Sequence, residues 1–192
     1  MMRAMGVVGL GAICLAAGSL GGYVYRGHHD LARLNANKQI ILRSHLEVWN
    51  EPDPRKAARA ANALYVKTFV LHDWTGDDAS GVAGVIKGVA ETRADFPDWY
   101  EHPQSAMSEG DYVADRFVST GRQARDLAPI PHIDPGVPNK GRRMRMPEMS
   151  MYRLVDGKIA EQWDFGDIWN ADRQLGLFDP DAWSRTAARK TR

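Results

Sequence analysis

The chain has 192 residues, 26% of them charged, and a formal net charge of +1, which fits one globular domain with an extension. Since this balance provides no overall basic field for a phosphate backbone, we expect no nucleic-acid partner. The single cysteine, Cys14, excludes an intramolecular disulfide.

The N-terminal segment from Met5 to Tyr25 has no charged residue and is close to the roughly 20 residues that a helix needs to cross a bilayer. Two interpretations stay open: a secretory signal cleaved near Ala16, and an uncleaved single-span anchor with Tyr23 at the interface. Both make residues 1–28 a targeting segment and place the domain in a bacterial periplasm or at a membrane. A buried cytoplasmic helix is a third interpretation.

Apolar residues that recur every three or four positions predict three helices at the start of the domain. The first ends at the breaker "NEPDP", and the second has Asp53 as its cap and Pro54 as its first residue. Residues 65–74 are rich in β-branched and aromatic side chains, so we expect a short extended segment or a helix end that delivers His72. The predicted helices cover residues 30–49, 55–64 and 81–94.

The second half of the domain has the character of strands. Asp156 and Gly157 are a strong signal for a two-residue hairpin turn, and the Pro- and Gly-rich residues 124–141 predict a long loop. We therefore predict an α+β domain over 30–178, with helices on one face of a curved antiparallel sheet of about four strands, and a basic tail over 179–192. The predicted strands cover 99–107, 112–123, 143–155 and 158–167, and a last helix covers 169–175.

The closing hairpin mixes acids with large apolar side chains. A turn at Asp156 and Gly157 pairs Val155 with Lys158, and a regular register then places two sets of residues on opposite faces, which a bulge would exchange. A carboxyl group in an apolar pocket has a raised pKa and can exchange protons near neutral pH. The alternative is a half-covered strand whose acids lie at wet margins. The face expected to look inward carries Glu148, Ser150, Tyr152, Glu161, Trp163, Phe165 and Asp167.

From about Asn37 to Gly176 the chain resembles the SnoaL-like polyketide cyclases, or ester cyclases, of the NTF2-like superfamily. The resemblance rests on several stretches that follow one another in the family's order. They are "LEVWNEPD", "FVLHD", "RADFPDW", "EGDYVADRFVSTG", "GVPNKGRR" and "MYRLVDGKIAEQWDFGD" followed by "RQLG". The stretches together are specific for the family, and much less specific for one reaction.

The resemblance implies a cone-shaped α+β barrel with an enclosed pocket, and frequent homodimers. It also implies an intramolecular aldol reaction without metal or cofactor, in which an acidic residue of the last hairpin serves as acid and base. By its position in the motif Asp167 is the first candidate for that residue, and Asp164 replaces it if the register slips. His72 is then the assisting histidine, and Arg116 or Trp163 lines the pocket.

Three functional hypotheses stay open. The first is an enzyme, such as a cyclase, isomerase or lyase, that acts on a small and largely apolar carbonyl compound without a cofactor. The second is a membrane-tethered module that binds a hydrophobic ligand or a protein partner without chemistry, and in the third the sheet serves only as a dimerisation surface. Scattered histidines predict no metal site. The candidate catalytic residues are Asp167, His72, Glu148 and Asp164, and the candidate substrate-binding residues are Trp163, Glu161, Arg116, Phe165, Tyr152 and Ser150.

Overall fold

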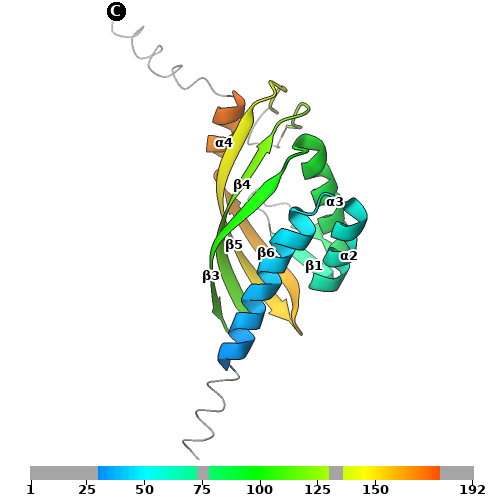
Figure 1. Ribbon diagram of the computed structural model, residues 1–192, viewed down its shortest axis with the longest axis vertical. Coiled ribbons are helices and arrows are strands. Elements are labelled where there is room, and N and C mark those ends of the chain that lie inside the picture. Colours follow the sequence, from blue (N-terminus) through cyan, green and yellow to red (C-terminus); the bar gives the residue numbers. More distant parts are fainter. Residues whose placement is uncertain (1–29, 73–77, 130–135, 178–192) are drawn as a thin grey trace, which may run out of the picture.

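The computed structural model describes residues 30–72, 78–129 and 136–177 (Figure 1). The predicted targeting segment and the basic tail lie outside these residues. Within them, no helix has the length and apolar character that crossing a membrane requires. The elements are an N-terminal helix (30–44), η1 (His45–Trp49), α2 (Pro54–Leu64), β1 (Tyr65–His72), β2 (Asp78–Ser80), α3 (Gly81–Asp95), β3 (Tyr100–Glu109), β4 (Tyr112–Arg122), β5 (Arg143–Val155), β6 (Lys158–Gly166) and α4 (Ile168–Leu175).

The strands form one six-stranded sheet in the order β2-β1-β6-β5-β4-β3. The N-terminal helix, α2 and α3 lie on one side of this twisted sheet, and α4 packs against β5 (Figure 1). The predicted α+β class is confirmed, and the predicted antiparallel strands correspond to β3, β4, β5 and β6. The prediction of about four strands is incomplete, because the β-branched run after α2 forms β1, which pairs parallel to β6.

Local sequence signals act as expected at the ends of these elements. The Asp53 side chain accepts hydrogen bonds from the backbone N–H groups of Arg55 and Lys56, and caps α2. At the hairpin, Asp156 and Gly157 have φ angles of 48° and 71°, the left-handed pair that a tight two-residue turn requires. The turn was therefore predictable, and it fixes where β5 and β6 begin to pair.

The pairing of β5 and β6 departs from the predicted register soon after the turn. Leu154 pairs with Ile159 as predicted, but Arg153 then pairs with Glu161. Ala160 is thus an extra residue on β6, and this bulge exchanges the two faces of the strand beyond it. The prediction of a regular register is wrong. Glu161, Trp163 and Phe165 share the outer face, away from the helices, and Gln162 and Asp164 take the inner face beside Tyr152 and Ser150.

The outer face of the sheet exposes several large apolar side chains, and Met149 pairs directly with Phe165 there, with exposed fractions of 56% and 64%. Such a patch is typical of a protein–protein interface. The homodimer stays a prediction, and we expect its interface on this face. Introducing Glu at both Met149 and Phe165 is expected to convert a dimer to a monomer in light scattering after size exclusion, because two buried charges would lack partners.

The control for this experiment is Leu46→Glu, since Leu46 is also exposed but lies on the helical side. This variant is expected to remain dimeric. A monomeric wild-type protein, or a double variant that still dimerises, would contradict the prediction.

Candidate active site

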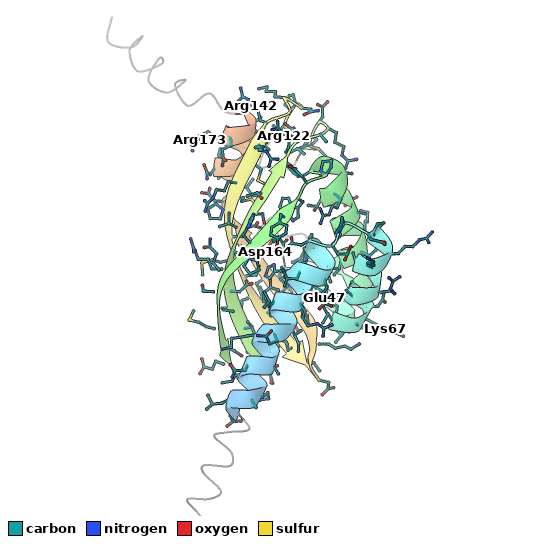
Figure 2. The ribbon with its side chains drawn as sticks, in the orientation of Figure 1. Glu47, Lys67, Arg122, Arg142, Asp164 and Arg173 are labelled. Carbon is teal, nitrogen blue, oxygen red and sulfur yellow. The ribbon has the colours of Figure 1, made fainter. Side chains whose placement is uncertain are left out.

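A cavity of about 160 Å³ lies between the inner face of the sheet and η1. Asp164 lies near the middle of the fold, where the N-terminal helix crosses the sheet (Figure 2). The walls combine aromatic rings with titratable groups. The lining residues are His45, Trp49, Trp99, Glu101, Phe117, Glu148, Tyr152, Gln162 and Asp164.

His45 is held between two carboxylates at the cavity wall. Its Nδ1 donates to Glu101 Oε2 at 2.5 Å and its Nε2 donates to Asp115 Oδ2 at 2.6 Å. Burial alone would lower the pKa of His45, but the hydrogen bonds to Asp115 and Glu101 and their charges raise it to about 10. His45 is therefore an imidazolium at neutral pH, in a buried group of three that we call the His45 triad (His45, Glu101 and Asp115).

The chain brings the triad together from three separate elements. His45 opens η1, a widened helical turn of a kind often found at functional sites. Asp115 occupies an inward position of β4 between Val113 and Phe117, which are both buried. The backbone N–H of Glu101 donates to the side chain of Asn50, which follows η1, at 2.7 Å. This bond ties the start of β3 to the helix end and fixes Glu101 beside His45.

Asp164 is the carboxyl group that the bulge turns towards the cavity. Burial raises its pKa, the hydrogen bond from Ser150 lowers it, and the charges of Glu101 and Asp115 raise it, to about 6 overall. Ser150 Oγ donates to Asp164 Oδ1 at 2.5 Å. Near neutral pH, Asp164 is thus mostly ionised and able to take up a proton.

Glu148 lines the same cavity from the neighbouring strand and is 7% exposed. Its Oε1 is buried and has no hydrogen-bond partner among the residues that the structure describes. Burial, and then the charges of Asp164 and Glu101, raise the pKa of Glu148 well above its usual value. The direction of this shift favours the neutral acid form of Glu148.

This arrangement can run acid and base chemistry together. Two carboxyl groups whose environments give them different pKa values are the usual means of assigning one as base and the other as acid. Trp49, Trp99 and Phe117 supply the aromatic part of the cavity walls. Over the described ranges, no group of three or more His, Cys, Asp or Glu side chains is arranged to hold a metal ion.

The structure brings together only part of the predicted site. Glu148, Tyr152 and Asp164 line the cavity, and Ser150 binds Asp164. Asp167 does not reach the cavity: it is exposed and caps α4, its side chain accepting from the backbone N–H of Asn170. The remaining predicted residues lie elsewhere.

His72, Trp163 and Glu161 lie together outside the cavity. The His72 ring stacks on Trp163, and its Nε2 lies 3.8 Å from Glu161 Oε2. Glu161 also pairs with Arg153. Phe165 is exposed, and Arg116 is exposed and donates to Gln104.

Sequence reasoning missed the His45 triad. One signal was present, because His45 follows Ile41 by four positions and precedes Val48 by three, which places it on the buried stripe of the first helix. Asp115 likewise interrupts an alternation of buried apolar residues. No pattern distinguishes Glu101, because almost all of the other residues of β3 are exposed.

Known proteins share both the sequence pattern and the fold. The pattern of the SnoaL-like polyketide cyclase family matches residues 39–175. IdmH, a candidate polyketide cyclase from Streptomyces antibioticus, is 26% identical with a TM-score of 0.58, over 73% of this chain and 98% of its own. A candidate polyketide cyclase from Acidithiobacillus ferrooxidans is also 26% identical, with a TM-score of 0.59 over 73% and 94%. AclR, a candidate hydroxylase from Streptomyces galilaeus, is 23% identical and shares the fold, with a TM-score of 0.63 over 82% and 92%. A comparison with curated proteins gives no match.

Proposed function

Because this chain belongs to the SnoaL-like polyketide cyclase family, we propose that it is a cofactor-free enzyme that moves protons next to a carbonyl group. Its substrate is a small and largely apolar carbonyl compound. The observation that carries this proposal is the pair of carboxyl groups, Asp164 and Glu148, in one cavity that also has aromatic walls. Burial raises the pKa of both, that of Asp164 to about 6 and that of Glu148 well above its usual value.

Each carboxyl group has a separate role in the proposed reaction. The Asp164 carboxylate removes a proton from the carbon beside the carbonyl group, and the C–H electrons become the enolate. Neutral Glu148 donates a hydrogen bond to the developing enolate oxygen, where a preorganised donor has its largest effect. Asp164 then returns its proton, either to another carbon in an isomerase or to the new alkoxide in an aldol cyclase.

The pH dependence tests this assignment. The measured quantity is the rate at which cyclohexanone exchanges its α-protons for deuterium in D₂O, followed by NMR. Since the base works only when ionised, the rate is expected to rise with pH through about 6, the pKa of Asp164, and to fall at higher pH where Glu148 loses its proton. A rate that does not change between pH 5 and 8 would contradict the proposal.

Variants of Glu148 separate its role as a hydrogen-bond donor from the effect of losing its proton at high pH. Glu148→Gln retains an N–H donor, so the rate should stay within about tenfold while the decline at high pH disappears. Glu148→Leu removes the donor and should lower the rate by about 10²–10³-fold, as for the loss of one oxyanion donor. If the wild-type protein binds the ketone but neither it nor any variant exchanges the α-protons, the binding-module hypothesis is supported instead.

A further inference from the structure

A second cavity adjoins the catalytic one. It has a volume of about 190 Å³ and lies between β1 and α3. Trp49 and Gln162 line both cavities, so these two side chains form the wall between them. We call the catalytic cavity the inner cavity and the second one the outer chamber. The other described residues that line the outer chamber are Phe69, Leu71, Gly81, Gly84, Val85, Lys87, Gly88 and Glu91.

The outer chamber remains open because α3 presents glycines to it. A glycine inside a helix costs about 1 kcal/mol relative to alanine, so some other requirement must favour it. Backbone conformation is no such requirement at Gly84 and Gly88, since neither has a positive φ angle. Crowding does not explain Gly88 either, because a Cβ there would lie 3.8 Å from Trp49 Cη2, an ordinary contact. At Gly88 the missing side chain leaves space beside Trp49, and Gly84 lines the same chamber.

The dimensions of the two cavities define a class of ligand. An engineered apolar cavity of about 150 Å³ holds one benzene molecule, so the inner cavity has room for a single six-membered ring. The buried Glu148 Oε1, which lacks a partner within the described part of the chain, offers a polar contact to a ligand there. Phe69, Leu71 and Val85 make the outer chamber apolar. Lys87 and Glu91 pair with each other at 3.2 Å, so the charged side chains among the described walls of the chamber balance each other.

We propose that the substrate is a ring-sized carbonyl compound that carries an uncharged apolar chain of a few carbons. The carbonyl end occupies the inner cavity beside Asp164 and Glu148, and the chain passes Trp49 into the outer chamber. The placement of the carbonyl end rests on the proposed function, whereas the placement of the chain rests on the outer chamber alone.

Binding of 2-alkylcyclohexanones to the full chain tests this proposal. Dissociation constants are measured by NMR titration for chains of zero to eight carbons. Each methylene that enters the outer chamber should strengthen binding about fourfold, until the chamber is full and the affinity reaches a plateau. A wild-type affinity that does not depend on chain length would overturn the proposal.

Substitutions on α3 locate the chain. Gly84→Leu fills the outer chamber and should abolish the dependence on chain length, while the affinity for cyclohexanone stays within about twofold. With Gly88→Ala the affinity should reach its plateau at a chain about one carbon shorter. This variant should also raise the melting temperature by about 2–4 °C through helix propensity, so it is expected to fold. The control is Ala83→Leu, since Ala83 is exposed on α3 and does not line the chamber. An unchanged chain-length dependence in both glycine variants would overturn the proposal.

The two proposals fail in different ways. If wild-type protein shows the chain-length dependence but exchanges no α-protons, the proposed function is wrong and the outer chamber still binds the chain. If exchange follows the expected pH profile but affinity is independent of chain length, only the outer-chamber proposal is wrong.

Discussion

Replacing Asp164 with Asn is expected to lower the rate of α-proton exchange by about 10²–10⁴-fold, the usual contribution of a general base. The amide has nearly the same size as the carboxyl group but cannot accept the proton. Ser150 Oγ, which donates to Asp164 Oδ1 at 2.5 Å, can still donate to the amide oxygen. The fold and the affinity for the ketone should therefore remain, and circular dichroism and NMR titration check both.

Asp167→Asn provides a matched control only three residues away. Asp167 is exposed and caps α4, and asparagine caps helices about as well as aspartate. The exchange rate of this variant should stay within about twofold of the wild-type rate, with little change in stability. Equal losses in both variants, or full activity in Asp164→Asn, would show that Asp164 is not the base.

The contrast between these two residues marks how far the sequence could predict the site. Regular periodicities and the Asp156–Gly157 turn predicted most elements of the fold, because those signals act over a few residues. The direction of Asp164 depends on the single extra residue, Ala160, which carries no recognisable bulge signal such as a glycine. With a side-chain period of two, that one residue decides whether Asp164 or Glu161 faces the cavity.

Long-range pairing explains why the His45 triad was not predicted. Glu101 lies 56 positions from His45 and Asp115 lies 70 positions away, so no local pattern relates them. The sequence could have placed His45 on a buried stripe, where a histidine most simply forms a hydrogen bond to the backbone. Only the tertiary arrangement shows that both ring nitrogens meet carboxylates, which gives the site a buried cation between two anions.

The second large effect is expected at the His45 triad. Replacing His45 with Leu is expected to reduce the free energy of unfolding by about 3–5 kcal/mol, the usual result of removing one member of a buried charged group. Glu101 and Asp115, which are each 5% exposed, would then lie buried without the cation between them. Urea unfolding followed by tryptophan fluorescence measures this loss.

The pH dependence of wild-type stability tests the same cation without a substitution. In the unfolded chain His45 loses its proton near pH 6.5, whereas in the folded chain its pKa is raised to about 10. Its contribution to stability is therefore complete below pH 6.5 and is lost as the pH rises towards 10. Stability should fall by an amount on the order of 3–5 kcal/mol across that window. A constant free energy of unfolding from pH 6.5 to 10 would contradict a charged His45.

Two further variants separate charge from packing in this prediction. His102 is an exposed histidine next to Glu101 on β3, and His102→Leu should change stability by less than about 0.5 kcal/mol. Adding Glu101→Gln and Asp115→Asn to His45→Leu removes the unpaired anions, so this triple variant should recover part of the lost stability and lose the part of the pH dependence that the His45 triad contributes. A triple variant no more stable than His45→Leu alone would mean that His45 stabilises the fold by packing against Phe117, whose ring centroid is 4.7 Å away, rather than by its charge.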